Sequence, residues 1–516
     1  MAPNDAAQAV LDYVHAVRTR WTAPIAPPGF APDWADRPDP HTYYPQTERQ
    51  PLPLHDPQVP AGDGRFDLPL LGSFLHLSAG VLSRRWQIDW SPDIAGATTL
   101  TGARWGRGTP SGGGSYPLEL YVAADPSAPM SSGIHHYASG LHALERVAAG
   151  NPVPEIAGAL RPGRPDGTDA YLLCALRFWK SAYKYNNFSY HLMLHDLGAF
   201  LGSWGALGQQ YGVVGDPCLA FDDRALARML GLDPREGGVL AVLPLSWADR
   251  PPGSSPLRCD DHRARPVRSA PRERSRETRE FPLVSAVHEA TSVNPPLDTG
   301  RLDEPLPDPP AGVVPLDTAD SADSGAGPVP VADALARRAS ANGRFNGGRP
   351  VRISVLGEAL RAASHGLGGT RGGVRLRLAA RRVAGLEAGV YDYHPERHAL
   401  VPVANTAALD DRVYALPNYS VGQAAVTVVS HWQPERAVAR AGPRAYRYVA
   451  VAAGAAAQRL QLAATRAGLA SGIVLGFQGP VLEDAIGLTA EGRHGLLCVF
   501  MGHHQEGIAR LDDRLY

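Results

Sequence analysis

A lysine and a tyrosine stand side by side at positions 184 and 185, directly before a segment in which apolar residues recur every three to five positions from Phe188 to Trp204. This spacing predicts a helix. The positive end of a helix dipole disfavours an ammonium ion and favours a phenolate, so Lys184 and Tyr185 are candidate general bases. The alternative is a salt-bridged lysine beside a core tyrosine, with Lys180 as the competing lysine.

A glycine-rich stretch, Arg107-Gly-Thr-Pro-Ser-Gly-Gly-Gly-Ser-Tyr-Pro117, precedes a strand-like run over residues 118–122. Consecutive glycines let the backbone take positive φ and expose N–H groups to a flat or anionic ligand. No Gly-Lys-Ser or Gly-Lys-Thr follows, so the stretch is not a Walker loop, and it lacks the closing glycine of a nucleophile elbow. Unless the stretch is only a turn, the residues that would face a ligand are Pro110, Ser111, Gly112, Gly113 and Gly114.

Two adjacent arginines, Arg337 and Arg338, follow a short apolar run in the second half of the chain. Guanidinium groups present forked N–H donors that match phosphate oxygens, so the pair is a candidate anion site. Ser340 lies two residues beyond and offers a hydroxyl group. The alternative is a solvated helix end.

The second half of the chain repeats the first at a constant offset of 256 residues. Gly133-Ile-His-His-Tyr137 matches Gly389-Val-Tyr-Asp-Tyr393, and the matches continue over more than 100 residues. Single residues that match at this offset are Gly198 and Gly454, Gly212 and Gly468, and Phe221 and Phe477. The sequence therefore predicts a duplicated domain.

The two copies have diverged where chemistry could take place. Residues 366–373 stand opposite residues 110–117 and lack the Pro-Ser and Tyr-Pro pairs of that loop. Arg440-Ala441 replaces Lys184-Tyr185, whereas the arginine pair has no counterpart before the first copy. Because each copy carries only half of the candidate residues, we expect one complete site at the interface between the copies.

The length of 516 residues is sufficient for two or three domains. We expect an N-terminal helix and extended wrap over 1–62, copy 1 over 63–249, a linker over 250–330 and copy 2 over 331–516. The linker is rich in Pro, Asp, Arg and Ser. We expect it to be solvated apart from one short helix over 281–293, and peptide docking is the alternative.

Composition excludes several other classes of function. The net charge of −1 indicates no electrostatic attachment to nucleic acid or membrane. The four cysteines are scattered, which favours neither a disulfide framework nor a zinc site. His191 and His195 have helical spacing but lack the Glu of a His-Glu-x-x-His site, so we expect no metal. With no signal peptide and no apolar run of about 18 residues, we expect a cytoplasmic protein.

Several motifs together resemble one known family. They are Trp34-Ala-Asp-Arg-Pro38, Tyr44-Pro45 and Leu52-Pro-Leu54, the Pro-Ser-Gly-Gly loop followed by Pro117-x-Glu-x-Tyr121, Lys184-Tyr185 before a long helix, and Arg-Arg-x-Ser opening the second copy. Over about residues 30–505, the chain resembles the two-copy, nitroreductase-fold, FMN-dependent azoline dehydrogenases of the SagB and thiopeptide type.

The resemblance implies an α+β fold in which tandem nitroreductase-like domains form an intramolecular pseudo-dimer with FMN between them. The flavin ring would rest on the backbone of Pro110–Gly114, and the arginine pair would meet its phosphate. Leu475 and Gly476 would approach the flavin edge. The family commonly has serine directly after the two arginines, whereas Ala339 intervenes here before Ser340, so the atom that meets the phosphate stays open.

The resemblance also implies a reaction: oxidation of thiazolines or oxazolines in a ribosomally made peptide to thiazoles or oxazoles, in thiopeptide-like antibiotic biosynthesis. Lys184 or Tyr185 would take the Cα proton, FMN the hydride, and O2 would reoxidise the flavin. The partners would be the azoline-containing precursor peptide and the cyclodehydratase of the same pathway. The alternatives are a general FMN nitro or quinone reductase that needs NAD(P)H, and a non-catalytic scaffold of a peptide-modifying complex.

Overall fold

In the computed structural model, the described residues are 2–54, 64–89, 99–100, 104–161, 168–213, 215–247, 265–266, 270–292, 302, 308–309, 312–316, 329–341, 345–366, 373–404, 409–414, 416, 418–505 and 510–514. The expected domain boundaries after residues 62 and 249 lie outside them, as does most of the copy 2 segment that stands opposite the glycine-rich loop.

Copy 1 is built on one antiparallel sheet with the strand order β1-β7-β6-β5-β8-β9, in which β10 also pairs with β7. Its strands are β1 (Arg49–Pro51), β5 (Leu118–Ala124), β6 (Gly133–Ala138), β7 (Ala143–Ala149), β8 (Ala170–Arg177), β9 (Gly237–Leu245) and β10 (Arg265–Pro266). The middle strands β5, β6 and β8 are buried almost throughout, because helices cover the sheet.

Copy 2 is built on a second antiparallel sheet with the order β11-β16-β15-β13-β17-β19-β18. Its strands are β11 (Val314–Pro315), β13 (Arg375–Ala380), β15 (Gly389–His394), β16 (Ala399–Ala404), β17 (Val426–Trp432), β18 (Ala470–Val474) and β19 (His494–Gly502). A short parallel pair, β12 (Val351–Arg352) and β14 (Val383–Ala384), lies outside this sheet. The predicted α+β class is confirmed.

The elements of the two copies correspond at the offset found in the sequence. β6 begins at Gly133 and β15 at Gly389, while β8 begins at Ala170 and β17 at Val426, so each pair is separated by 256 residues. In copy 1, β6 pairs with the next strand, β7, in antiparallel fashion, and in copy 2 β15 pairs with β16 in the same way. The duplication seen in the sequence is therefore a duplication of fold.

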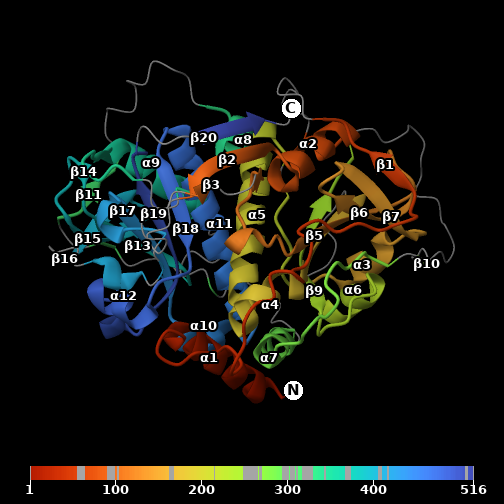
Figure 1. The fold of residues 1–516 in the computed structure, drawn as a ribbon, viewed down its shortest axis with the longest axis horizontal. Coiled ribbons are helices and arrows are strands. Elements are labelled where there is room, and N and C mark those ends of the chain that lie inside the picture. Colours follow the sequence, from red (N-terminus) through yellow and green to blue (C-terminus); the bar gives the residue numbers. More distant parts are fainter. Residues whose placement is uncertain are drawn as a thin grey trace.

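The long helices α5 (Ser189–Tyr211) and α11 (Ala445–Arg466) lie side by side at the centre, between the two sheets (Figure 1). Gly198 and Gly454, which match in the sequence, meet where these helices cross. A Cβ atom on Gly198 would lie 2.9 Å from the Gly454 Cα atom, and a Cβ atom on Gly454 would overlap the carbonyl oxygen of His195. Only glycine at both positions permits so close an approach.

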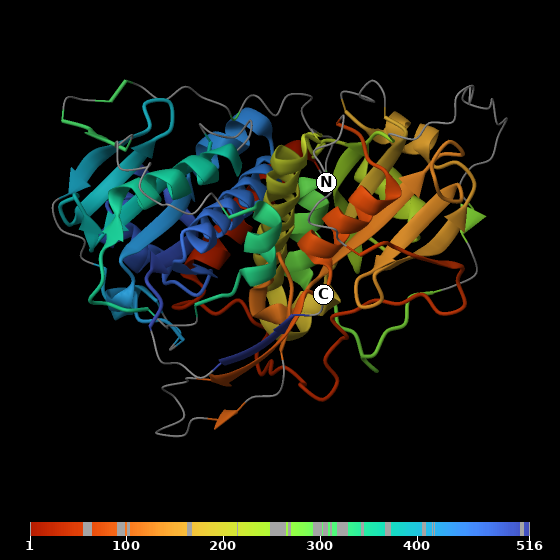
Figure 2. The same ribbon diagram turned by 90° about the horizontal axis from the view of Figure 1, so that it is seen from above.

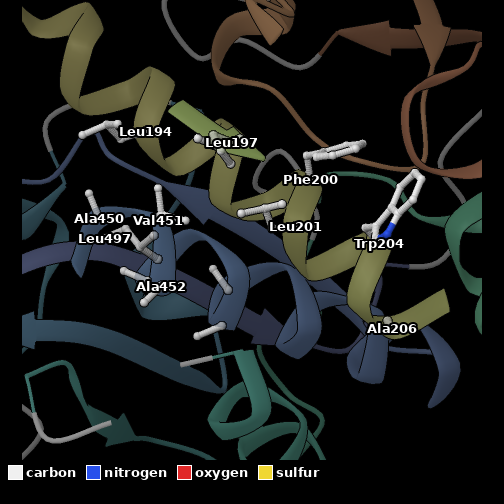
Figure 3. Close-up of a cluster of buried hydrophobic side chains, with 14 of the residues drawn as sticks. Leu194, Leu197, Phe200, Leu201, Trp204, Ala206, Ala450, Val451, Ala452 and Leu497 are labelled. Atoms are coloured by element: carbon white, nitrogen blue, oxygen red, sulfur yellow. The ribbon is translucent and has the colours of Figure 1, made fainter. Parts of the chain in front are cut away.

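Large side chains of α5 and small side chains of α11 make the core beside this crossing (Figure 3). The labelled buried residues are Leu194, Leu197, Phe200, Leu201, Trp204 and Ala206 from α5, Ala450, Val451 and Ala452 from α11, and Leu497 from β19. Alanines on one helix leave room for the bulky residues of the other, and the interface between the copies is as apolar as a domain interior.

Shorter helices surround this core. In the N-terminal segment and copy 1 they are α1 (Pro3–Thr19), α2 (Leu68–Ala79), α3 (Val153–Ala159), α4 (Trp179–Tyr185) and α6 (Asp223–Met229), with the 3₁₀ turns η1 (Gly112–Gly114) and η2 (Asn186–Phe188). In copy 2 they are α8 (Val331–Arg337), α9 (Ile353–Gly366), α10 (Pro434–Ala441) and α12 (Gly479–Ala485), with η6 (Asp411–Val413), η7 (Val421–Gln423) and η8 (Thr489–Glu491). Among the described residues, no helix is both long and apolar enough to cross a bilayer.

The two ends of the chain each reach the other copy. The C-terminal strand β20 (Arg510–Arg514) pairs with β2 (Ser83–Asp89) of copy 1, beside β4 (Arg104–Gly106) and β3 (Thr99–Leu100), as the blue and orange arrows of Figure 2 show. From the N-terminal helix, Arg18 forms an ion pair with Glu483 of copy 2 at 2.6 Å. The copies are therefore held together by exchanged elements as well as by the central helices.

The linker is not merely solvated. Its predicted helix is present as α7 (Pro282–Thr291), and Val284, Val287 and His288 are buried against copy 1 and the interface. Further upstream, the Ser275 hydroxyl group donates to the Asp36 carbonyl oxygen at 2.7 Å. The helix was expected, but solvation of the rest was not wholly correct, because Ser275, Leu302 and Leu316 are also buried.

Candidate functional site

The glycine-rich loop of copy 1 contains the 3₁₀ turn η1 at its tip. Gly113 and Gly114 have φ angles of 61° and 70°, in the left-handed region that side chains disfavour. Both glycines are exposed, whereas residues 107–109 at the base of the loop are buried. The loop therefore presents bare backbone outward from a fixed base.

Side chains of copy 2 hold the base of this loop. Arg338 of copy 2 donates from Nε to the Gly108 carbonyl oxygen at 2.8 Å and from Nη2 to the Arg107 carbonyl oxygen at 3.0 Å. Gln458 of α11 donates to the Gly108 carbonyl oxygen at 3.2 Å. The loop belongs to copy 1 in sequence, but copy 2 fixes its position.

The middle of the loop is bonded to α5 of its own copy. The Ser111 hydroxyl group donates to Asp196 Oδ2 at 2.6 Å, and the Gly112 N–H group donates to Asp196 Oδ1 at 3.0 Å. The Tyr116 N–H group donates to Ser111 Oγ at 2.9 Å and closes the turn. Ser111 therefore faces the protein interior, and the glycines after it face outward.

The structure does not bring Arg337 and Arg338 together. The Arg337 side chain is 50% exposed at the end of α8 and lies 3.7 Å from Asp333, whereas Arg338 is buried against copy 1. Burial, together with nearby Arg85, lowers the pKa of Arg338 to about 10, so this side chain remains charged at neutral pH. Ser340 follows in extended conformation and bridges to Ser471. The junction carries positive charge that suits an anion.

Lys184 and Tyr185 lie beside the glycine turn. A Cβ atom on Gly113 would be 2.7 Å from Lys184 Nζ and closer still to the Tyr185 hydroxyl oxygen. The pair ends α4 instead of directly preceding α5, because Asn186, with a φ angle of 44°, breaks the helix between them. The loop and the basic pair, predicted separately, share one surface.

The phenolate expected for Tyr185 is wrong. Burial raises the pKa of Tyr185, and the carboxyl group of Asp196 raises it further. The C-terminal end of α4 carries the negative end of that helix's dipole, which also disfavours a phenolate. Tyr185 is therefore a hydrogen-bond donor at neutral pH. The same helix end favours the ammonium form of Lys184, so Lys184 stays a candidate base only through its position beside the turn.

Lys180 is committed elsewhere. Its Nζ atom lies 2.5 Å from Glu119 Oε1, and both side chains are buried. His136 lies 2.8 Å from the other oxygen, Oε2, of that carboxylate. Thr42 donates to Oε1 at 2.6 Å. These contacts lower the pKa of Glu119, so the ion pair is a structural element of copy 1. Of the two lysines weighed in the sequence, only Lys184 reaches the loop.

Leu475 and Gly476 form the facing wall in copy 2. The carbonyl oxygen of Leu475 accepts a hydrogen bond from Arg20 of the N-terminal segment. A Cβ atom on Gly476 would lie 3.0 Å from the Tyr414 ring. Burial raises the pKa of Tyr414, and Tyr185 of copy 1 contributes to that shift across the interface. Arg20 also lies 4.3 Å from the centre of the Phe188 ring, so it connects Leu475 of copy 2 with the segment that follows Tyr185 in copy 1.

Three residues of this site were not predicted from the sequence. Asp196 holds the loop, and Arg20 holds the copy 2 wall. Trp34, which is 55% exposed, places its ring 5.5 Å from Lys184 Nζ. The only sequence signal was for Trp34, within the Trp-Ala-Asp-Arg-Pro motif. Asp196 and Arg20 are distant in sequence from the groups that they contact.

A buried charged cluster lies on the copy 1 side of the interface. Asp223 of α6 binds both Arg447 of α11 and Arg444, the N-cap residue of α11, and all three side chains are buried. Arg447 also donates to the His288 carbonyl oxygen of α7 at 3.1 Å and to Thr291 Oγ1 at 2.8 Å. The linker helix thus covers this cluster.

The histidines with helical spacing are engaged within the protein. His191 Nδ1 lies 2.7 Å from the Tyr446 hydroxyl oxygen, and its Nε2 lies 3.1 Å from the Leu496 carbonyl oxygen. His195 Nδ1 lies 2.7 Å from the His191 carbonyl oxygen. Among the described residues, no cluster of three or more metal-ligating side chains is found.

Comparison with known proteins gives the class. Residues 334–503, which make up most of copy 2, match the model of the nitroreductase family. The crystal structure of an Anabaena variabilis protein assigned to the nitroreductases aligns with 96% of this chain and 99% of its own, with a TM-score of 0.70 and 20% identity. The fold of both copies is therefore of the nitroreductase type.

Two further solved structures align with parts of the chain. A Ralstonia eutropha protein assigned to the nitroreductases covers 40% of this chain and 99% of its own, with a TM-score of 0.31 and 23% identity. The E. coli microcin synthetase McbBCD complex with truncated pro-MccB17 bound covers 39% and 78%, with a TM-score of 0.29 and 18% identity. No curated protein matches the chain.

Proposed function

We propose that the protein is an FMN-dependent dehydrogenase that oxidises thiazolines or oxazolines in a ribosomally made peptide to the aromatic azoles. The observation that carries this proposal is the position of Lys184 and Tyr185 against Gly113 of the glycine turn. Aromatisation removes a carbon-bound proton as well as a hydride, so it needs a base beside the flavin. A simple reductase has no such need.

The residues present fit a flavin. A Cβ atom at Gly113 would overlap the Tyr185 hydroxyl oxygen, whereas a Cβ atom at Gly114 would have nothing within 4 Å, so the backbone that is open to a ligand lies at Gly114. We propose that Pro110 to Gly114 support the ring from copy 1 and that Leu475 and Gly476 approach its edge from copy 2.

For the phosphate, the buried charge of Arg338 supplies attraction while its N–H groups hold the loop. Arg337 and Ser340, next to it in the chain, are the proposed direct contacts. The sequence predicted instead that both arginines would bind the phosphate directly.

The chain's own contribution is proton management. When bound, FMN supplies the acceptor for the hydride, and O2 takes both electrons at the end of the cycle. Lys184 takes the proton from Cα, the ring gains one double bond, and the lysine returns that proton to solvent. Tyr185, which stays protonated, donates a hydrogen bond that orients the azoline. The Trp34 ring lies 5.5 Å from Lys184 Nζ and helps to position the lysine.

The proposed partners follow from this reaction. An azoline must be formed from a cysteine, serine or threonine residue before it is oxidised, so a cyclodehydratase acts earlier on the same precursor peptide. We propose a cytoplasmic location, where such peptides are made.

The alternative function is an NAD(P)H-dependent reductase of nitro compounds or quinones, and the match of copy 2 to the nitroreductase family favours it. The test is to purify the protein, record its flavin spectrum and incubate it with an azoline-bearing peptide. Mass spectrometry then shows the loss of two hydrogens for each ring oxidised. Quinone reduction by NAD(P)H with no loss of mass from any azoline peptide would favour the alternative.

A further inference from the structure

We propose that Asp196 is a positioning residue of the flavin site: its carboxylate holds the Ser111–Gly112 turn in the form that receives the cofactor, and loss of its charge loosens that turn. The proposal rests on the proposed flavin site. It concerns a group that lies behind the loop, on α5, and that does not touch the cofactor or the substrate.

The hydrogen bonds around Asp196 require both of its carboxylate oxygens to act as acceptors. Ser111 donates its hydroxyl proton to Oδ2, and Gly112 donates its N–H group to Oδ1. Ser111 cannot be turned around without loss, because its Oγ atom already accepts from the Tyr116 N–H group at 2.9 Å. A carboxylate satisfies two donors, whereas a protonated carboxyl group brings a third donor to the same place. The turn is therefore matched to the ionised form.

The charge of Asp196 is costly and is retained in copy 1 alone. Burial raises the pKa of Asp196 to about 7, although the hydrogen bonds from Ser111 and Gly112 oppose that shift. The equivalent position in copy 2 is Ala452, so the fold does not need an acid there. A buried carboxylate that the fold does not require is expected at a site with a function.

The neighbouring ionisable groups do not replace it. Tyr185, whose pKa is raised by burial and by Asp196, stays neutral near pH 7. Burial lowers the pKa of His195 on α5 to about 4, so this histidine is also neutral. Tyr116 belongs to the loop itself, and Lys184 lies on the outer side of the turn, beside Gly113. Asp196 is thus the group behind the turn that changes charge near neutral pH.

The experiment compares Asp196→Asn with Ser203→Ala in the full chain. Ser203 lies on the same helix, and its Oγ atom is 2.7 Å from the Thr109 hydroxyl oxygen at the base of the loop, but it does not titrate. The Kd of the apoprotein for FMN is measured by fluorescence quenching from pH 5.5 to 8.5, and amide hydrogen exchange of residues 111–116 is measured in parallel without FMN.

For the parent, we expect FMN to bind about tenfold more tightly at pH 8 than at pH 6, the size of effect given by one weakened charge-assisted hydrogen bond. In Asp196→Asn this pH step should disappear and the loop amides should exchange faster at pH 8. In Ser203→Ala the pH step should remain.

The outcomes separate this proposal from the function on which it rests. A parent that binds FMN with the same pH step as Asp196→Asn overturns the role of Asp196 and leaves the flavin site intact. A parent that binds no FMN overturns the proposed function. In that case, amide hydrogen exchange of the loop still decides the role of Asp196. After correction for intrinsic exchange rates, a turn that depends on the charge of Asp196 gives a pH-dependent change in exchange in the parent and none in the variant.

Discussion

Arg444 of α11 donates a hydrogen bond from Nε to the carbonyl oxygen of Leu219 at 2.9 Å, across the interface between the copies. Leu219 is the copy 1 counterpart of Leu475, whose carbonyl oxygen accepts from Arg20. On the Leu219 side, the neighbouring space holds the buried cluster around Asp223 and the covering helix α7. On the Leu475 side, Trp21 of the N-terminal segment donates to the nearby Phe477 carbonyl oxygen at 2.8 Å. The two counterpart carbonyl groups are therefore held by different elements, one beside the linker helix and the other by the N-terminal segment.

We predict one FMN per chain. Copy 2 has Arg440-Ala441 and Ala452 in place of the Lys-Tyr pair and Asp196, and the arginine pair has no counterpart before copy 1. Flavin released by heat is quantified against protein by absorbance. A ratio near two would contradict the asymmetry described above.

Gly113→Val should abolish flavin binding without unfolding the protein. Any Cβ atom at this position overlaps Tyr185, and the φ angle of 61° disfavours side chains. Gly369→Val, at the equivalent position of copy 2, is the matched control and should retain flavin. Circular dichroism establishes that both variants are folded, and a Gly113→Val protein that stays yellow would place the flavin elsewhere.

Lys184→Ala and Tyr185→Phe should retain FMN but lose azoline oxidation. A positioned acid or base contributes about 10²–10⁴-fold, which corresponds to roughly 3–5 kcal/mol of activation free energy. Because Tyr185 is a protonated donor, its loss should cost less than the loss of Lys184. The measurement is the rate of mass loss from an azoline peptide, per bound flavin.

Lys180→Met is the control for this pair. Removing one partner of a buried ion pair costs about 3–5 kcal/mol of stability, so the variant should unfold at a lower temperature while each folded, flavin-loaded molecule keeps its activity. Wild-type-like conversion by Lys184→Ala, together with an inactive Lys180→Met, would reverse the assignment.

Arg338→Ala should weaken FMN binding more than Arg337→Ala does. The Arg338 side chain is buried and donates to two carbonyl oxygens of the loop base, whereas Arg337 is half exposed. A lost charge-assisted hydrogen bond costs about 1.5–3 kcal/mol, or roughly 10- to 100-fold in Kd. Equilibrium dialysis against FMN measures both variants, and equal affinity for the two would refute the loop-support role.

Asp196→Asn should gain stability relative to the parent as the pH rises. The pKa of Asp196 is raised from 3.8 to about 7 in the folded protein, so its contribution to stability is present below pH 4 and is lost as the pH rises to about 7. Three pKa units correspond to about 4 kcal/mol. The difference in thermal midpoint between variant and parent, without FMN, should grow from pH 4 to pH 7 and then level off. A difference that is constant with pH would contradict the raised pKa.

Most of the fold could be predicted from the internal repeat, because two copies that match at an offset of 256 residues are expected to share their strands and helices. The paired glycines Gly198 and Gly454 already marked the helix crossing. The glycine turn and the Lys184-Tyr185 pair were also found in the sequence, since their residue types indicate chemistry locally.

What could not be predicted are contacts between distant segments and the local breaks that aim side chains. Nothing in the sequence links Asp196 to Ser111, or Arg338 to the Gly108 carbonyl oxygen, because a carbonyl group leaves no signature. The left-handed Asn186 is equally hidden, and it moved Tyr185 from the start of one helix to the end of another. The error in the charge state of Tyr185 followed from this break and from burial and the contact with Asp196, which the sequence does not show either.

The pairing of β20 with β2 has a consequence for synthesis. Ser83 pairs with Arg514, so β2, near the start of copy 1, can pair with β20 only after residues 510–514 have been synthesised. Arg338 likewise reaches back to a loop translated much earlier. A ribosome-bound chain can fold much of copy 1, but the proposed flavin site stays incomplete until Arg338 and the rest of copy 2 have left the ribosome. Products that lack copy 2 would therefore remain without cofactor, which makes cofactor loading depend on the synthesis of both copies.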